Sequence, residues 1–194
     1  MAPATIRIAM PDWLSDAIRN TPACPDDELK MQAVIGLAQR NLERDTGGPF
    51  AAGIFDLRTH RMIAAGVNVV VPTHLSCAHA EITALSLAQQ QLGNHDLAAI
   101  GDFALASSTE PCAMCCGALP WSGIRRLICG ATSADACAIG FDEGPRHPDW
   151  IAELTRRGIT IATEVCRHEA RAILQRYVQR GGPIYNGSAG ARTP

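Results

Sequence analysis

His79-Ala80-Glu81 and Pro111-Cys112-Ala113-Met114-Cys115 are the two stretches around which the chain is organised. Cys112 and Cys115 lie three residues apart, so on a helix their side chains project within about 60° of each other and can hold one ion. His79, at the start of another predicted helix, supplies a third ligand. Three ligands leave one position of tetrahedral zinc open, which is typical of a catalytic rather than a structural site. The motifs therefore predict one Zn²⁺ cofactor held by His79, Cys112 and Cys115.

Glu81 is the expected catalytic base of this zinc site. Zinc can lower the pKa of a bound water from about 15.7 to about 7. Two thiolates cancel the charge of the ion and weaken this effect, so a nearby base is needed to take the proton. Glu81 follows the histidine ligand in the same predicted helix, which places it one turn from the metal.

Each of these residues taken alone has a simpler explanation. A single histidine before a helix is usually a cap or a core residue, and a free cysteine often serves as a small buried hydrophobic side chain. Order and spacing together favour metal binding. Cys116 follows Cys112 by four residues and shares its helix face, so spacing alone does not exclude it as a ligand. His74 and Cys77 lie just before the histidine motif, but the ligand set is complete without them.

Composition predicts one globular domain in a reducing compartment. The 194 residues are 47% hydrophobic and 19% charged, and the net charge of −2 gives no field that would attract nucleic acid or an anionic membrane. No apolar run is long enough to span a membrane, and the N-terminus has no secretory pattern. The spacing of the eight cysteines does not indicate a disulfide scaffold. We therefore expect a cytoplasmic protein.

The order of predicted elements indicates an α/β fold. We expect helices at residues 26–42, 78–93 and 167–180 and from Pro111 onward, and strands at residues 50–57, 62–71, 103–106, 126–129 and 159–162. The first two strands are separated by a short polar connection, which is typical of a hairpin. The later alternation of strands and helices implies parallel pairing with helices on both faces of the sheet. Residues 1–25 are predicted to form an N-terminal arm, residues 26–180 the domain, and residues 181–194 a C-terminal tail.

The zinc motifs resemble the signature of the cytidine deaminase superfamily. Further segments are similar to the zinc-dependent bacterial guanine deaminases within it, including those that accept the triazine ammeline. These segments are Gly47-Gly48-Pro49-Phe50, Asn68, Trp121 and Ile139-Gly140-Phe141-Asp142-Glu143. The resemblance runs from about residue 30 to about residue 185. It implies a three-layer α/β/α fold with a five-stranded mixed sheet flanked by helices, and a homodimer.

The resemblance also implies an activity and further site residues. The expected reaction is hydrolytic deamination of guanine to xanthine and ammonia, with Glu143 as a second catalytic carboxyl and Asn68 as a reader of the base edge. The tail would then cover the site and contribute Tyr185. Flat heteroaromatic rings favour stacking, so Phe50 and Trp121 are expected to contact the substrate, together with the backbone N–H of Ala80.

Three alternatives remain open from the sequence. The substrate could be another small amino-heterocycle or nucleoside, such as ammeline, guanosine, cytosine or a pterin precursor. An editing enzyme similar to tRNA adenosine deaminases has the same zinc motif, but the charge of −2 and the absence of a concentrated Lys/Arg groove argue against it. The third alternative is a structural zinc module. A set of only three ligands, with Glu81 beside them, argues against this alternative.

Overall fold

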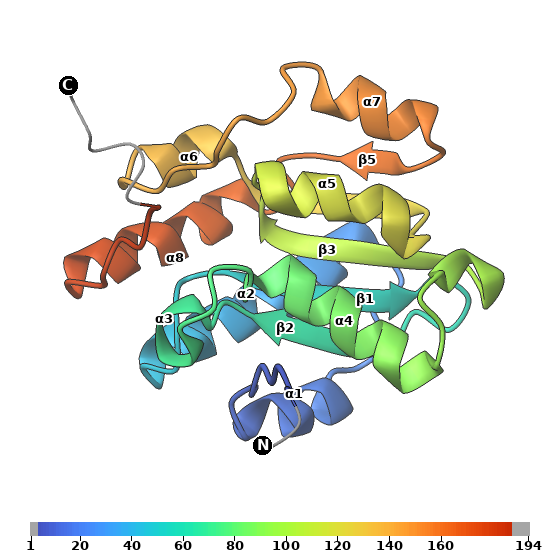
Figure 1. The fold of residues 1–194 in the computed structure, drawn as a ribbon, viewed down its shortest axis with the longest axis horizontal. Helices are drawn as coiled ribbons and strands as arrows, with labels where there is room; N and C mark the ends of the chain where they lie inside the picture. The colour runs from blue at the N-terminus through green and yellow to red at the C-terminus, as the bar shows by residue number, and fades with distance from the viewer. Residues whose placement is uncertain (1–3, 188–194) are drawn as a thin grey trace.

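A five-stranded mixed sheet forms the middle layer of the computed structural model, which describes residues 4–187 (Figure 1). The strand order is β2-β1-β3-β4-β5. The strands are β1 (Ala51–Asp56), β2 (Met62–Val67), β3 (Phe103–Thr109), β4 (Arg126–Ala131) and β5 (Thr160–Ala162). β1 is antiparallel to both β2 and β3, whereas β3, β4 and β5 pair in parallel. This confirms the expected fold class, with a hairpin followed by parallel strands.

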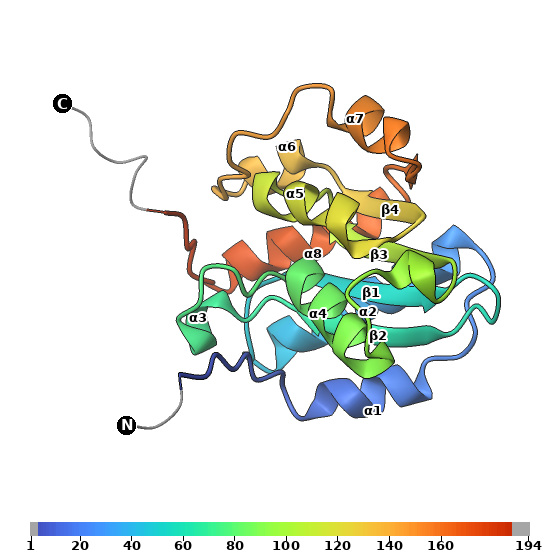
Figure 2. The same ribbon diagram turned by 45° about the vertical axis from the view of Figure 1, so that its right-hand side comes forward.

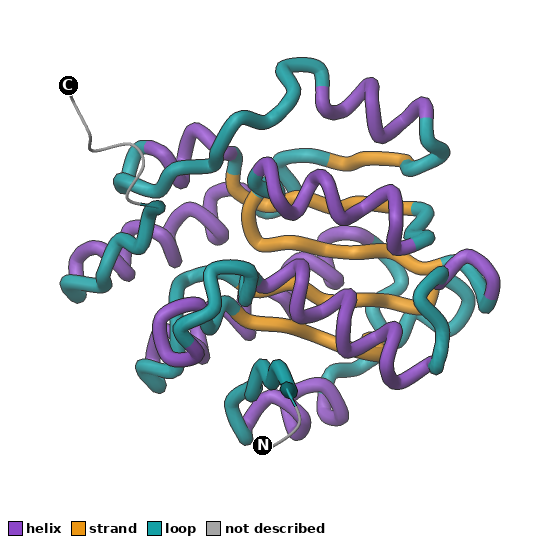
Figure 3. Tube along the Cα trace, viewed as in Figure 1, coloured by secondary structure: helices purple, strands orange, loops and turns teal. Residues whose placement is uncertain are grey.

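Helices cover both faces of the sheet, as Figure 3 shows. They are α1 (Trp13–Asn20), α2 (Asp27–Glu43), α3 (Val70–Thr73), α4 (Ala80–Leu92), the short 3₁₀ helix η1 (Leu97–Ala99), α5 (Ala113–Ser122), α6 (Ser133–Cys137), α7 (Trp150–Arg156) and α8 (Arg167–Gln179). Side chains of α2 and α8 join one hydrophobic core, and those of α4, α5 and α7 join the other. The chain therefore folds as three layers.

β3 explains why both faces need a helical cover. Its side chains alternate between the two cores, with Ala104 and Ala106 on the α2 side and Phe103 and Leu105 on the α4 side. Successive residues of a strand point to opposite faces, so a run that is apolar throughout must be covered twice. Every residue of β3 is buried.

Two features at helix ends match the sequence. Asp26 caps α2, and its side chain accepts a hydrogen bond from the backbone N–H of Leu29 at 2.7 Å. Gly93 ends α4 in the left-handed conformation at φ +67°, which glycine adopts without steric cost. Both limits follow from local residue chemistry and lie close to the predicted ones.

Three short segments differ from the predicted elements. The second strand was expected to reach Val71, but β2 ends at Val67 and residues Val70–Thr73 form α3. The side chain of Asn68 accepts a hydrogen bond from the N–H of Val70 and turns the chain there, so strand-forming valines end up in a helical turn. The helices α6 and α7 also lie where none was predicted, because each is too short to give a helical repeat of apolar residues.

The N-terminal arm packs on the domain through α1. Trp13 and Leu14 are buried in the core that α2 and α8 share, and the Trp13 Nε1–H donates to Thr46 Oγ1 at 3.2 Å. The boundaries expected for arm, domain and tail stay predictions, and residues 188–194 of the tail lie outside the described residues. Within residues 4–187, no helix has the length and apolar character needed to cross a membrane.

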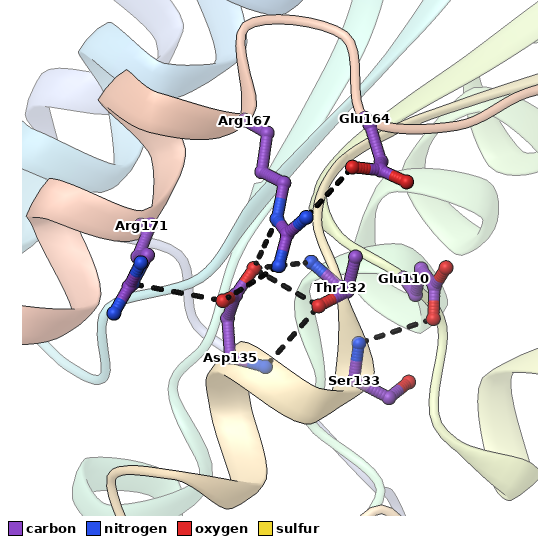
Figure 4. A network of polar contacts seen from close by, with 7 residues as sticks. All are labelled: Glu110, Thr132, Ser133, Asp135, Glu164, Arg167 and Arg171. Carbon is purple, nitrogen blue, oxygen red and sulfur yellow. Dashed lines mark hydrogen bonds and ion pairs between the residues drawn. The ribbon is translucent and has the colours of Figure 1, made fainter.

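A polar network fixes α6 and α8 to the end of β4 (Figure 4). Asp135 and Thr132 form a capping box at the start of α6, and Asp135 is only 7% exposed. The Asp135 carboxylate also accepts two hydrogen bonds from the Arg167 guanidinium, at 2.8 and 3.2 Å, while Arg171 lies 3.6 Å away. These bonds from Arg167 hold the pKa of Asp135 well below its usual range.

We expect Asp135→Asn to destabilise the protein at neutral pH and to lose that effect in acid. Because the pKa is depressed in the folded state, the stabilisation is present above the unfolded pKa of about 3.9 and disappears as the pH falls through the folded value. The expected cost at pH 7 is about 1–2 kcal/mol, reduced because Arg167 is partly exposed. Urea unfolding between pH 3 and pH 7 measures this cost and the beginning of its loss in acid. Glu153→Gln, in the exposed pair with Arg156, is the control and should change stability by less than about 0.5 kcal/mol.

Candidate active site

The site lies at the edge of the sheet where β2 and β3 end and β1 begins. Ala51 pairs with Val67 and Ala52 with Ser107, so these three strand ends lie side by side. The α4 and α5 helices run next to each other on one face of the sheet, as Figure 2 shows. Both begin at this edge, α4 after His79 and α5 after Cys112. Two helix N-termini therefore converge on the same place.

His79, Cys112 and Cys115 form the metal cluster that the sequence predicts. Their ligand atoms all lie within 4.8 Å of one another, and no other such cluster occurs in the described part of the chain. The His79 Nδ1 is 3.5 Å from Cys112 Sγ and 3.7 Å from Cys115 Sγ. Tetrahedral zinc with ordinary Zn–N and Zn–S bonds places nitrogen and sulfur about 3.6 Å apart. The spacing of the three donors therefore fits zinc.

The two thiols differ in charge state when no metal ion is bound. A hydrogen bond from Cys115 lowers the pKa of Cys112 to about 4, helped by the His79 ring. The same hydrogen bond and burial raise the pKa of Cys115. One thiolate and one thiol is thus the stable arrangement without metal, and both sulfurs become thiolates only when a positive ion offsets the second charge.

Glu81 is held beside the cluster without belonging to it. It is 6% exposed, and its Oε1 accepts a hydrogen bond from Ser107 Oγ at 3.0 Å. Its Oε2 is 3.4 Å from Cys115 Sγ. Burial is the main reason that the pKa of Glu81 is raised, with the Cys112 thiolate as the next cause. The arrangement provides a buried carboxyl group next to the metal ligands, with its orientation fixed by β3.

A cavity of about 200 Å³ opens in front of the cluster. It is lined by His79, Glu81, Cys112, Glu143, Asn68, Phe50, Phe141, Thr109 and Tyr185 among others. Glu143 thus faces the same space as Glu81. Burial raises the pKa of Glu143 to about 8, with further contributions from the negative charges of Cys112 and Glu81. Two carboxyl groups with raised pKa values therefore share one small cavity.

Aromatic rings form the side of the cavity next to the C-terminal tail. The Phe141 ring packs edge to face against Phe50 and against Tyr185, with ring centres 5.0 Å apart in both pairs. Asn186 fixes the tail, because its Nδ2 donates to Gly140 O at 2.8 Å and its Oδ1 accepts from the N–H of Asp142 at 2.9 Å. The tail therefore reaches the cavity, and it carries Tyr185 with it.

Gly48 makes room for the Tyr185 hydroxyl. A Cβ at position 48 would lie 2.0 Å from Tyr185 Oη, so no residue with a side chain fits there without displacing the tyrosine. Tyr185 Oη and Thr109 Oγ1 are both buried and make no hydrogen bond to the described residues. Unpaired buried hydroxyls are costly, so both are available to a ligand or water in the cavity.

Asn68 is buried at the end of β2 and lines the same cavity. Its backbone N–H donates to Phe50 O at 3.0 Å, and its Oδ1 accepts from the Val70 N–H at 3.2 Å. The Nδ2 group makes no hydrogen bond within residues 4–187. The asparagine thus combines the turn role that its residue type suggests with a free donor at the cavity.

Trp121 does not join the other candidate residues. Its side chain is 82% exposed on the outer side of α5 and does not line the cavity, so the expected stacking role does not fit its position within one chain. Ala80 is the first residue of α4, where its N–H lies at the helix end that faces the site. Cys116 donates its thiol hydrogen to Pro111 O instead of joining the cluster, while His74 and Cys77 are exposed.

Sequence reasoning did not single out three residues of the site. Thr109 belongs to no sequence motif of its own and only precedes Glu110-Pro111. Asn186 could not be identified from sequence because the contacts of the tail form only in the folded chain. Phe141 lies inside the segment that carried the resemblance, directly before the acidic pair, but its aromatic packing had no pattern of its own.

Comparison with known proteins assigns the family. Residues 25–131 match the model of the cytidine and deoxycytidylate deaminase zinc-binding region, and the chain belongs to this family. It is a zinc-binding hydrolytic deaminase. A solved structure of guanine deaminase from Nitrosomonas europaea is 46% identical, covers 89% of this chain and 96% of that one, and has a TM-score of 0.85.

Two further comparisons agree with this assignment. A structure solved in complex with 2,6-diaminopurine is 47% identical, with a TM-score of 0.87 and coverage of 93% of this chain and 96% of that chain. A curated guanine deaminase of Bacillus subtilis (strain 168) is 35% identical over 116 residues, which are 60% of this chain and 71% of that protein.

Proposed function

We propose that this enzyme converts guanine and water to xanthine and ammonia. The observation that carries the proposal is the single cavity in which the zinc ligands, Glu81, Glu143 and Asn68 meet. Relatives that span nearly the whole chain are guanine deaminases, and the cavity has the size of a small-molecule site. Ammeline is a second substrate that the same groups would accept.

His79, Cys112 and Cys115 would hold zinc, and zinc when bound would supply a water of lowered pKa. Glu81 accepts the proton of the water that attacks the carbon bearing the exocyclic amine. Its raised pKa favours this uptake, and the Ser107 hydrogen bond keeps the carboxyl group oriented. Glu81 then delivers the proton to the neighbouring ring nitrogen, so it acts first as a base and then as an acid.

Glu143 protonates the leaving nitrogen. Ammonia leaves far more readily than an amide ion, so the amine needs a second proton before the C–N bond breaks. Burial raises the pKa of Glu143, which favours a protonated carboxyl group that can donate to the amine. As the C–N bond breaks and the carbonyl forms, the hydroxyl group on the same carbon gives its proton to a carboxylate, which replaces the proton that Glu143 donated. Glu81 thus acts at the water and the ring nitrogen, and Glu143 acts at the amine.

Asn68, Phe50 and Tyr185 bind the base in this proposal. The free Nδ2 of Asn68 donates to an acceptor on the base edge. The rings of Phe50 and Tyr185 provide apolar walls for a flat heterocycle. The N–H of Ala80 and the unpaired hydroxyls of Thr109 and Tyr185 are further groups that bond to the substrate.

Ultraviolet monitoring of the zinc-loaded protein with guanine, ammeline, cytosine and guanosine in parallel tests the proposal. We expect guanine to be consumed with xanthine and ammonia formed in equal amounts. Turnover of another base with none of guanine would reject guanine as the substrate. Salt-dependent binding to a tRNA stem-loop would instead favour the editing alternative.

Asn68→Ala should weaken recognition of guanine. Loss of the hydrogen bonds to the base edge is expected to lower kcat/KM about 10-fold to 100-fold. The matched control is Asn94→Ala, because the Asn94 side chain makes the same kind of turn, accepting from the Asp96 N–H at 2.9 Å, at the other end of α4. Unchanged kinetics of Asn68→Ala, or equal losses in both variants, would show that the residue only supports the turn.

The expected homodimer and the cytoplasmic location stay predictions. Trp121 and Met114 are the exposed apolar side chains of α5, and a dimer interface on that helix would cover them.

A further inference from the structure

Arg146 connects the loop that carries Glu143 to the start of the zinc helix. Its Nη1 donates to Pro111 O at 2.9 Å, and its Nη2 donates to Glu110 Oε2 at 3.1 Å. Pro111 directly precedes the ligand Cys112. One planar guanidinium therefore bonds to both Glu110 and Pro111, the residues that lead into α5.

This ion pair is unusually well shielded for a loop residue. The side chain of Arg146 is 16% exposed and that of Glu110 is 13% exposed. The guanidinium also lies over the ring of Trp150, at 4.6 Å from the ring centre, and Trp150 is buried against the core of α4 and α5. Because the pair is shielded and stacked, removal of one partner would leave the other charge poorly solvated and unpaired, which is costly.

Glu110 gives Arg146 a rigid anchor. Its Oε2 also accepts a hydrogen bond from the Ser133 N–H at 3.0 Å, a contact drawn in Figure 4. Its backbone N–H donates to Ala131 O at 2.8 Å. Glu110 is thus fixed to the ends of both β3 and β4, which are central strands of the sheet.

On its N-terminal side, the loop around Glu143 is held by Asn186, which bonds to Gly140 and Asp142. The Glu143 carbonyl accepts from the Ala113 N–H at 2.8 Å. On the other side of Glu143, the Arg146 N–H donates to Gly144 O at 2.9 Å and closes a tight turn from Gly144 to Arg146. Gly144 adopts a positive φ of +68°, which most residues avoid. Because this turn directly follows Glu143, the position of Arg146 constrains the backbone on the C-terminal side of Glu143.

We propose that Arg146 is a positioning residue that holds the Glu143 carboxyl group in the cavity by clamping its loop to Glu110 and Pro111. The inference rests on the role proposed above for Glu143. Lysine cannot replace arginine here, because a single ammonium group neither bonds to both acceptors as a planar fork nor stacks flat on Trp150.

The test compares Arg146→Met, Arg146→Lys and Glu143→Gln, singly and combined, in zinc-loaded protein of verified metal content. We expect Arg146→Met to lower kcat about 10-fold to 100-fold, as misplacement of a catalytic group does, with little change in KM. Arg146→Met added to Glu143→Gln should lower kcat little further, because the group that Arg146 positions is already disabled. Arg157→Met is the control, since Arg157 is an exposed residue bordering the same outer groove as Arg146.

Several outcomes would overturn the inference. A kcat for Arg146→Met equal to that of the wild type would do so, even with a lower melting temperature, since that is the result of a purely structural role. Equal losses in the wild-type and Glu143→Gln backgrounds would show that Arg146 acts independently of Glu143. Full activity of Arg146→Lys would show that charge alone is sufficient.

The experiment separates this inference from the proposed function. Each fold-change is measured with whichever base the wild type deaminates, so rejection of guanine as the substrate leaves the comparison intact. If Glu143→Gln alone has normal kcat, the role of Glu143 fails and so does the positioning role that depends on it.

Discussion

Glu81→Gln should abolish nearly all turnover while the protein keeps its zinc. The amide has almost the same shape and can still bond to Ser107, but it can neither take the proton of the water nor return it to the ring. General acid and base catalysis contributes about 10²-fold to 10⁴-fold, and we expect kcat to fall by this amount. Steady-state kinetics with metal analysis of the same sample measures both quantities.

Glu28→Gln is the matched control for this substitution. Glu28 occupies the second position of α2, as Glu81 does in α4, so both changes remove the same favourable charge from a helix N-terminus. Glu28 is exposed and remote from the cavity, and its variant should keep wild-type kcat. Near-normal turnover by zinc-loaded Glu81→Gln would contradict the mechanism.

Cys115→Ser should lose both zinc and activity, whereas Cys116→Ser should keep both. Cys115 Sγ lies in the ligand cluster, and a serine hydroxyl is a poor substitute for a thiolate. Cys116 is the neighbouring residue, but its thiol donates to Pro111 O. We expect about one zinc per chain in the wild type and in Cys116→Ser, and much less in Cys115→Ser, by mass spectrometry of dialysed protein.

The reciprocal experiment is removal of zinc from the wild type by a chelator. Activity should disappear and return when zinc is restored. A Cys115→Ser protein that holds zinc and turns over substrate normally would show that the three-ligand assignment is wrong. Loss of zinc from Cys116→Ser would show that Cys116 contributes to zinc binding.

The sequence predicts the metal cluster well because its geometry is local. Cys112 and Cys115 share one helical turn, and His79 and Glu81 share another, so spacing alone limits where their side chains point. The convergence of the two turns then follows from strands that end at one edge of the sheet. The order of the strands and helices is therefore almost sufficient to predict the metal cluster.

The rest of the cavity could not be predicted in the same way. Thr109 and Asn186 reach it through contacts between distant parts of the chain, which no short pattern encodes. Trp121 was expected to contact the substrate because of its residue type and place after the zinc helix, but the rotation of α5 directs it outward. The limit of β2 was misjudged because valines favour a strand, whereas the Asn68 turn ends it earlier.

The pairing of Gly48 with the Tyr185 hydroxyl has a consequence for biosynthesis. Position 185 is translated after position 48, after every metal ligand and after both carboxyl groups, so the nascent chain holds these groups before this wall of the cavity exists. Domains fold as the ribosome releases them, N-terminal parts first. Until the segment that carries Tyr185 emerges, the cavity lacks this wall, and it is completed when the tyrosine packs against Gly48.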